Sequence, residues 1–340
     1  MNLLILAQKV DKTDGVLGFF HNWVNKLSTK FDHLTVICLE QGDYDLPPNV
    51  KVLSLGKEQG QSRLKYIWRF YKYIWQERHN YDAVFVHMNQ EYILLGGLFW
   101  KIFNKKVFLW RNHPIGNYLT KIAVWWSNVV FCTSPYSYTA RFSKTKLMPV
   151  GIDTDYFLPL NGIKRTKDIL FVGRLDRLKR PDILLKTINM LKKNGLNLST
   201  TFIGESTPGN ESYRIYFDQL IKKYDLVDNV FLMGAIPNTK TKYYYQTHKV
   251  FINLAPSGCL DKTIFEAMAC GSDILVTNNY LRSELGINVW TSGEVDDLVK
   301  KISEKFSKNK ISQEDNITLV NYVKKNHSLD FLVKAIKNYT

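Results

Sequence analysis

Short apolar runs alternate with segments of helical spacing along the first half of the chain. The runs predict strands at residues 3–7, 34–39, 50–55, 83–86, 107–110 and 129–132. The intervening segments predict helices at about residues 19–27, 62–78 and 92–103. Because strands that are apolar throughout and alternate with helices are typical of a parallel sheet covered on both faces, this half is expected to form an α/β domain.

The same pattern starts again after about residue 149. Strands are predicted at residues 169–172, 200–203, 230–233, 250–253 and 274–277, and helices at 181–193, 213–224 and 263–270. The last helix is followed by Gly271, a residue that suits the position after a helix end. The repetition predicts a second Rossmann-like unit.

The boundary between the two units is expected in Pro149-Val-Gly-Ile-Asp153, where proline and glycine interrupt the pattern. The predicted fold class is therefore α/β, with two Rossmann-like domains that face each other across a cleft. The expected domains are 1–148 and 149–318, followed by a short segment, 319–340. Open α/β sheets bind ligands beyond the carboxyl ends of their strands, so the ligand is expected in the cleft.

Composition narrows the class of protein. The 340 residues are 45% hydrophobic and 23% charged, which excludes a disordered chain. No apolar stretch approaches the roughly 18 residues that span a bilayer, and the N-terminal residues lack the basic start of a signal peptide. A soluble, cytoplasmic chain is expected.

Four scattered cysteines argue against a zinc site or a disulfide framework and suit a reducing compartment. They are Cys38, Cys132, Cys259 and Cys270.

The net charge of +15 indicates an anionic partner. Nucleic acid, anionic lipid and a phosphorylated substrate all fit such a charge. No acidic residue occurs between Tyr92 and Ile152. No nucleic-acid-binding motif is present in the sequence, so nucleic acid is the least favoured of the three.

Two cations follow the first strand of the second unit, in Val172-Gly-Arg-Leu-Asp-Arg-Leu-Lys-Arg-Pro181. Gly173 lets the chain leave the strand sharply, and Arg174 and Lys179 are then presented before a helix that begins near Pro181. Arginine can bind a diphosphate through two hydrogen bonds and lysine as a point charge. The alternative is a solvated basic loop.

A second candidate segment is Pro256-Ser-Gly-Cys-Leu-Asp-Lys-Thr-Ile-Phe-Glu-Ala-Met-Ala-Cys-Gly271. A helix is expected to begin near Thr263, and the free N–H groups and dipole of a helix start attract an anion. The carboxylate of Glu266 suits a ribose diol. The alternative is an ordinary glutamate that the helix dipole favours.

These two segments together resemble glycosyltransferase family 4. The likeness rests on Val-Gly-Arg-Leu-x-x-x-Lys at 172–179 and Phe-Glu-Ala-Met-Ala-x-Gly at 265–271, and it is strongest over about 149–278. The resemblance implies a GT-B fold, in which 1–148 is the acceptor-side domain, 149–318 binds the nucleotide sugar, and 319–340 is a helical segment that returns to the first domain. It implies a retaining hexosyl transfer from a nucleotide-diphosphate sugar to a glycan or lipid-linked acceptor. It also implies that neither a metal nor another cofactor takes part.

The resemblance assigns roles to individual residues. Arg174 and Lys179, which follow Gly173, would bind the donor diphosphate and stabilise its growing charge, and Glu266 would hold the ribose. The nucleotide base would lie near Gly234, Ala235 and Ile236. His113 is similar to a histidine near the transferred sugar, and Gly15 lies in a loop that is weakly similar to the first glycine loop of the family.

One position departs from the family. A glutamate that usually contacts the donor sugar is replaced by Gly258, and Asp261 in the same loop is the candidate substitute. Lys262 and Thr263, at the expected helix start, would complete the anion site.

The helix expected at 62–78 has an apolar face at i, i+3, i+4 and i+7 spacing. That face comprises Leu64, Ile67, Trp68, Tyr71, Ile74 and Trp75, and a second aromatic ridge comprises Tyr66, Phe70 and Tyr73. With its many cations, the helix suits an anionic membrane surface, where it would bring the chain to a lipid-linked acceptor. The favoured alternative is a helix that packs one face on its sheet and leaves solvated cations outside.

Three other classes of function are left open. Another GT-B enzyme, such as a sugar phosphorylase or a nucleotide-sugar epimerase, would have the same fold and other chemistry. A non-catalytic carbohydrate- or lipid-binding protein would explain Gly258. Nucleic-acid binding would explain the charge alone.

Overall fold

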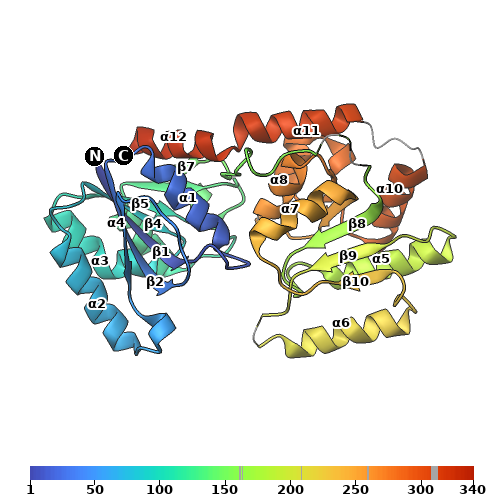
Figure 1. Ribbon diagram of the computed structural model, residues 1–340, viewed down its shortest axis with the longest axis horizontal. Coiled ribbons are helices and arrows are strands. Elements are labelled where there is room, and N and C mark those ends of the chain that lie inside the picture. Colours follow the sequence, from blue (N-terminus) through green and yellow to red (C-terminus); the bar gives the residue numbers. More distant parts are fainter. Residues whose placement is uncertain (161, 163, 208, 259, 308–312) are drawn as a thin grey trace. The chain divides into compact units, whose positions relative to one another are not determined.

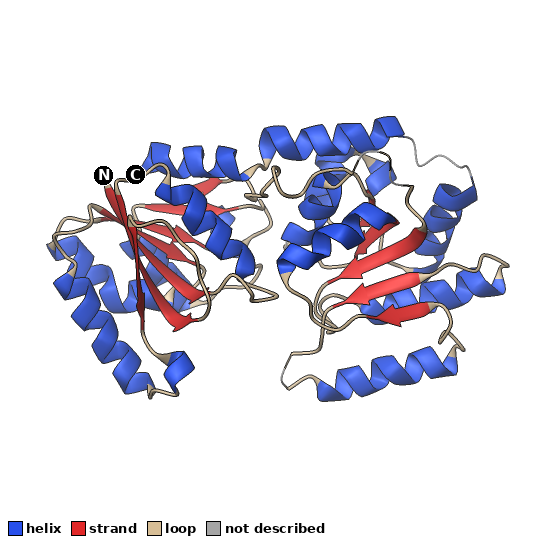
Figure 2. Ribbon diagram, in the orientation of Figure 1, coloured by secondary structure: helices blue, strands red, loops and turns tan. Residues whose placement is uncertain are grey.

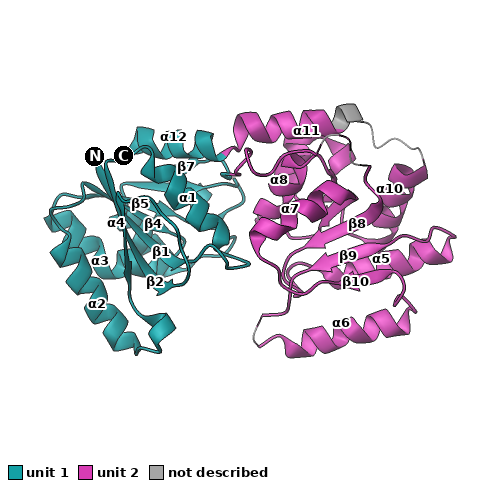
Figure 3. Cartoon of the chain, viewed as in Figure 1, with its two compact units in different colours: residues 1–151, 329–340 teal, residues 152–328 magenta. Residues whose placement is uncertain are grey.

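The computed structural model describes residues 1–340 except 161, 163, 208, 259 and 308–312. The chain divides into two compact units, which Figure 3 colours separately. Unit 1 comprises Met1–Gly151 together with Leu329–Thr340, and unit 2 comprises Ile152–Ser328. Each unit is described by itself.

Unit 1 is built on a seven-stranded parallel sheet in the order β3-β2-β1-β4-β5-β6-β7. Its strands are β1 (Asn2–Val10), β2 (His33–Gln41), β3 (Val50–Ser54), β4 (Ala83–His87), β5 (Lys106–Trp110), β6 (Val129–Cys132) and β7 (Thr145–Leu147). Its α-helices are α1 (Gly18–Ser28), α2 (Arg63–Gln76), α3 (Glu91–Ile102), α4 (Tyr118–Trp126) and α12 (Leu329–Tyr339), and two short 3-10 helices are η1 (Lys57–Gln59) and η2 (Tyr138–Arg141).

Both faces of the unit 1 sheet are covered, because successive side chains of a strand point to opposite faces. From β1, Leu3 and Ile5 join a core with α1 and α12. Leu4 and Leu6 join a second core on the other face, with α2, α3 and α4. Figure 2 shows helices flanking the strands.

Unit 2 has a five-stranded parallel sheet in the order β10-β9-β8-β11-β12. The strands are β8 (Lys167–Val172), β9 (Thr200–Ile203), β10 (Val230–Leu232), β11 (His248–Asn253) and β12 (Asp273–Val276). The helices are α5 (Pro181–Lys193), α6 (Glu211–Lys223), α7 (Asn238–Thr247), α8 (Lys262–Ala269), α9 (Asn279–Leu285), η3 (Ile287–Val289), α10 (Val295–Ser307) and α11 (Gln313–Asn326). The core on one face joins α5, α6 and α10, while α7 and α8 contact the other side of β11 and α11 packs on α8.

The prediction of two parallel α/β sheets is confirmed. Sequence patterns missed β7, α4, α7, α9 and α10. The first unit continues to Gly151, where the sequence suggested 148, and its returning segment begins at Leu329, where the sequence suggested 319. The helix α11 belongs to unit 2 instead.

The cysteines Cys38, Cys132 and Cys270 are buried and free, and Cys259 lies outside the described residues. Within the described part of the chain, no helix is both long and apolar enough to cross a membrane.

Candidate functional site

The sheet of unit 2 reverses its order between two neighbouring central strands, β8 and β11. Chain connections lead from β8 toward β9 and β10 on one side, and from β11 toward β12 on the other. Figure 1 shows β8, β9 and β10 side by side. Since all five strands are parallel, the loops that follow β8 and β11 leave the same edge of the sheet. Such a switch point is where open α/β sheets bind ligands.

The loop after β8 is held by a buried carboxylate. Asp176 accepts the backbone N–H of Lys179 at 2.9 Å and forms an ion pair with Arg174, with 3.3 Å between Nε and the carboxylate. Arg180 has a positive φ of 54°, which turns the chain into α5 with Pro181 as its first residue. These contacts present Arg174 with an exposed side chain and leave Lys179 mostly buried.

Three glycines bring the ends of β8, β9 and β10 together. The N–H of Gly173 donates to the carbonyl of Ile203 at 2.9 Å, and that of Gly204 donates to Gly234 at 2.8 Å. Gly204 has a φ of 130°, and a Cβ there would lie 2.0 Å from the carbonyl oxygen of Gly173. Only glycine fits such a position. The predicted base-binding segment from Gly234 to Ile236 therefore follows a strand end that is linked to the cation loop.

Lys179 and Asp261 connect this loop to the start of α8. The ammonium of Lys179 lies 2.7 and 2.5 Å from the two carboxylate oxygens of Asp261. Asn253, the last residue of β11, donates from Nδ2 to the same carboxylate at 2.9 Å. The three side chains thus link the strand ends on both sides of the switch point.

Asp261 occupies the N-cap position of α8, but its side chain makes no capping hydrogen bond. Because the carboxylate is engaged by Lys179 and Asn253, it does not cap the N–H groups of the first turn, at Lys262 and Thr263. Among the described residues, the buried hydroxyl of Thr263 has no hydrogen-bond partner. The helix start therefore keeps polar groups for an anion.

Glu266 lies further along α8, where it is only 3% exposed. Asn238 Nδ2 donates to one carboxylate oxygen at 3.1 Å, and the hydroxyl of Tyr245 donates to the other at 3.0 Å. Each oxygen keeps a second lone pair. A ribose diol would share the carboxylate with these two side chains or displace one of them.

Burial sets the ionisation of this part of the site. It raises the pKa of Glu266, although Asn238, Tyr245 and the nearby Lys262 oppose the rise. Burial lowers the pKa of Lys262 to about 7, and the Glu266 carboxylate opposes that change. Sequence patterns did not indicate Asn238 and Tyr245, because α7 is polar and lacks a clear helical pattern.

The other predicted residues lie in unit 1. His113 is exposed in the loop after β5, and the N–H of Ile115 donates to its Nδ1 at 3.0 Å. Gly15 is exposed in the loop between β1 and α1. Within unit 2, the structure therefore brings together the cation loop, Gly234, Asp261 and the start of α8. His113 and Gly15 belong to unit 1 and are not part of this group.

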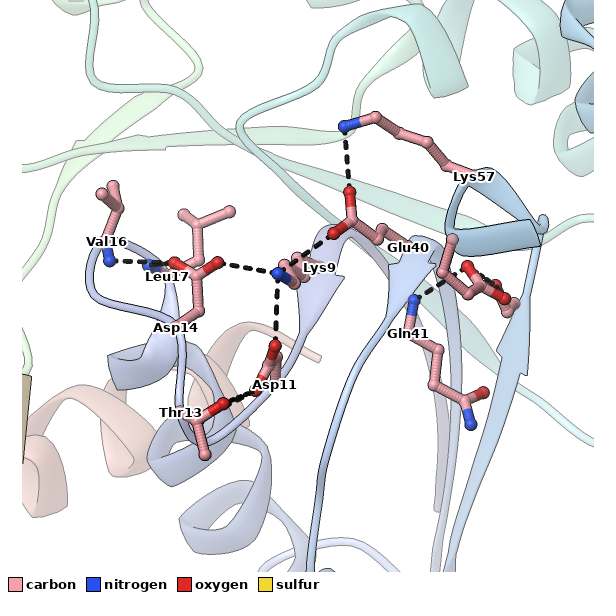
Figure 4. A network of polar contacts seen from close by, with 11 residues as sticks. Lys9, Asp11, Thr13, Asp14, Val16, Leu17, Glu40, Gln41 and Lys57 are labelled. Carbon is pink, nitrogen blue, oxygen red and sulfur yellow. Dashed lines mark hydrogen bonds and ion pairs between the residues drawn. The ribbon is translucent and has the colours of Figure 1, made fainter. Parts of the chain in front are cut away.

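A network of charges surrounds the Gly15 loop (Figure 4). The ammonium of Lys9 lies 3.2 Å from Asp11, 2.9 Å from Asp14 and 3.0 Å from Glu40. Burial alone would lower the pKa of Lys9, but hydrogen bonds to these carboxylates raise it above its usual value. With three carboxylates beside Lys9, this loop does not suit a phosphate. No sequence pattern indicated this network.

Asp14 also holds the loop itself, since its carboxylate accepts hydrogen bonds from the N–H groups of Val16 and Leu17 at 2.9 and 2.8 Å.

Over the described ranges, no group of three or more His, Cys, Asp or Glu side chains is arranged to hold a metal ion.

Comparison with known proteins places this geometry in context. Residues 159–318 match the family described as glycosyl transferases group 1. The D-inositol 3-phosphate glycosyltransferase of Pseudarthrobacter chlorophenolicus is 24% identical over 151 residues, which is 41% of this chain and 35% of that protein. The chain thus spans about a third of the length of this curated relative.

Solved structures resemble the whole chain. The Anabaena protein HepE, solved in complex with UDP and glucose, has a TM-score of 0.79 and 17% identity, covering 100% of this chain and 99% of that one. Sucrose-phosphate synthase from Thermosynechococcus elongatus has a TM-score of 0.80 and 16% identity, covering 100% and 98%. Both likenesses concern the fold, and they confirm the predicted GT-B architecture of two Rossmann-like units.

Proposed function

Since residues 159–318 match the glycosyl transferases group 1 and the chain has the GT-B fold, we propose that it is a retaining, metal-independent glycosyltransferase. The donor is a nucleotide-diphosphate sugar, and the acceptor is a glycan or a lipid-linked sugar. The observation that carries the proposal is the convergence of Arg174, Lys179 and the start of α8 at the switch point of the unit 2 sheet.

Departure of the diphosphate is the step that these groups assist. The acceptor hydroxyl attacks the anomeric carbon on the face that the diphosphate leaves. The bond from that carbon to the diphosphate oxygen breaks, the new glycosidic bond forms, and the hydroxyl proton passes to the departing phosphate. Negative charge grows on the diphosphate, where two cations and free N–H groups stabilise it without a metal.

The ion pair between Lys179 and Asp261 supports a switch of partners on donor binding. In the chain without ligand, the carboxylate of Asp261 neutralises the ammonium of Lys179. A diphosphate brings more negative charge, and it attracts Lys179 away from Asp261. Asp261, still held by Asn253, is then available to accept hydroxyl groups of the donor sugar. This exchange would supply a carboxylate for the donor sugar in place of the usual glutamate, which is replaced by Gly258.

Calorimetric titration with UDP and a transfer assay with UDP-glucose test the proposal, because HepE structures hold these two ligands. Arg174→Ala and Lys179→Ala should each lower turnover by about 100- to 1,000-fold, since the loss of one such donor typically costs about 3–4 kcal/mol. Thermal stability should change little in Arg174→Ala, because that side chain is exposed, and it should fall somewhat in Lys179→Ala, because Lys179 is mostly buried and paired with Asp261.

Arg177→Ala is the matched control, since Arg177 is an exposed cation of the same loop. It should keep both affinity and turnover. Wild-type transfer by the Arg174→Ala/Lys179→Ala double variant would overturn the proposal. Tight UDP-glucose binding without transfer to any sugar or lipid-linked acceptor would favour a non-catalytic binding protein.

A further inference from the structure

The helix α2 turns an unexpected face toward its sheet. Phe70 and Ile74 are buried in the core, and Tyr66 and Tyr73 pack beside them. The regularly spaced apolar face points outward instead, with Leu64 79%, Trp68 60% and Trp75 53% exposed. The helix thus packs one face on its sheet, as the favoured interpretation expects, but the buried face is mainly the second aromatic ridge, and the regularly spaced apolar face is left exposed.

The exposed apolar surface continues onto the two neighbouring helices. Trp75 contacts Phe99 and Phe103 of the α3 segment, with ring centroids 6.1 and 5.9 Å apart. Lys101 of α3 lies over the rings of Trp125 and Trp126 in α4, at 5.3 and 5.5 Å. We call the outward side chains of these helices the basic aromatic face. Its large exposed apolar members are Leu64, Ile67, Trp68, Tyr71, Trp75, Leu98, Ile102, Tyr118, Ile122 and Trp125.

Cations are interleaved with these rings. Lys72 lies 5.2 Å from the centroid of Trp68, and Arg78 lies 4.3 Å from that of Trp75. Residues 63–126 contain ten Lys and Arg against three Asp and Glu, so this stretch of the chain carries a net charge of +7. One of the three, Glu77, is buried and paired with Lys51.

We propose that the basic aromatic face binds an anionic lipid surface. Tryptophan and tyrosine rings suit the boundary between headgroups and acyl chains, and flanking lysine and arginine side chains reach the anionic headgroups. The face would lie on the membrane without crossing it. This binding does not depend on glycosyl transfer, although it would bring a transferase to a lipid-linked acceptor.

Charge and apolar surface together favour an anionic membrane over a second copy of this chain or a nucleic acid. In a symmetric dimer, the face would meet itself and set its unbalanced cations against their copies. Nucleic acid would satisfy the cations and some rings, but the aliphatic side chains of Leu64, Leu98 and Ile102 would find no apolar partner along a phosphate backbone. An anionic membrane satisfies both kinds of side chain.

Sedimentation of the full chain with vesicles tests this proposal. Vesicles of phosphatidylcholine with about 30% phosphatidylglycerol should bind the protein at low salt, and pure phosphatidylcholine should bind it at least about tenfold more weakly. Lys65→Glu/Lys72→Glu should weaken binding to the anionic vesicles by about tenfold or more, and Trp68→Ala/Trp75→Ala should also weaken it. Both pairs are exposed, and melting temperature and UDP affinity verify that each variant is folded.

The matched control is Lys222→Glu/Lys223→Glu, which makes the same charge change on exposed residues of α6 and should keep vesicle binding. Absence of binding to anionic vesicles at low salt would overturn the proposal, as would equal loss in the α6 control. A dimer in solution that Trp68→Ala/Trp75→Ala dissociates would show that a second copy covers the face. Tighter binding to random duplex DNA than to the vesicles would assign it to nucleic acid.

Discussion

At the scale of single residues, the carboxylate of Asp261 has two opposing effects on a donor. It holds Lys179 in place beside the switch point, and it adds a negative charge where a diphosphate is proposed to bind. Its geometry is fixed from the other side by Asn253. Removing its charge is therefore expected to change nucleotide affinity and sugar transfer in opposite directions.

Asp261→Asn should raise affinity for UDP by roughly three- to tenfold, because the diphosphate no longer competes with a charged carboxylate for Lys179. Transfer from UDP-glucose should fall, since the amide is a weaker acceptor for sugar hydroxyls. Calorimetry and the transfer assay measure the two effects. Asp225→Asn, on an exposed residue whose positive φ asparagine tolerates, is the control. A UDP affinity that is unchanged or weaker in Asp261→Asn would refute the partner exchange.

At the scale of elements, sequence patterns gave the central strands and α5 almost residue by residue, because buried parallel strands are apolar throughout. They did not give the packing of α2. Both of its faces carry large apolar or aromatic side chains, so spacing alone does not say which one meets the sheet. The Lys179–Asp261–Asn253 contacts were equally hidden, since they join the loop after β8 to the end of β11 and the loop that follows it, about 80 residues further along the chain.

The helix α12 shows how one element completes a core made elsewhere in the sequence. Leu332 is fully buried in the core with Trp23, whose indole N–H donates to the carbonyl of Gly151 at 3.0 Å. Gly151 has a φ of 76°, and a Cβ there would lie 2.3 Å from Leu332 Cδ2 and 2.8 Å from the Trp23 ring. Glycine is therefore needed where the first stretch of unit 1 ends.

Leu332→Ala should lower the free energy of unfolding of unit 1 by about 2–5 kcal/mol, as expected for a buried leucine. Gly151→Ala should also destabilise the unit, through its positive φ and its contact with Leu332. In the double variant the clash with Cδ2 is absent. Its loss in free energy of unfolding should therefore be about 1 kcal/mol smaller than the sum of the losses in the two single variants. Urea unfolding followed by circular dichroism measures the cycle, and additivity within about 0.3 kcal/mol would contradict the contact.

At the scale of the whole molecule, two buried histidines are expected to make the stability of unit 2 sensitive to acid. Burial lowers the pKa of His248 to about 4, and burial likewise lowers that of His327 to about 4. His248 uses both ring nitrogens, with the Tyr244 carbonyl and the Thr201 hydroxyl each 2.8 Å away.

An unfolded histidine titrates near pH 6.5, so below that pH the unfolded chain binds protons that folded unit 2 does not. The stability of unit 2 is therefore expected to fall as the pH drops from about 6.5 to 4, by about 2–3 kcal/mol for each histidine between pH 7 and 4.5. Urea unfolding of unit 2 at each pH can be followed by fluorine NMR of fluorotryptophan-labelled protein. Trp290 reports on unit 2 because it is the single tryptophan of residues 152–328. His248→Gln/His327→Gln should flatten the pH dependence, and an equally steep loss in that variant would contradict the assignment.

The division of unit 1 into two stretches has a consequence during translation. A ribosome makes residues 1–151 first, then all of unit 2, and only afterwards the helix whose Leu332 and Ile336 close the first core. At ordinary elongation rates, roughly ten to thirty seconds separate these events. Throughout that interval the nascent unit 1 carries an open apolar groove beside Trp23, which makes it a natural client for a holding chaperone, whereas unit 2 is contiguous and can fold as it emerges.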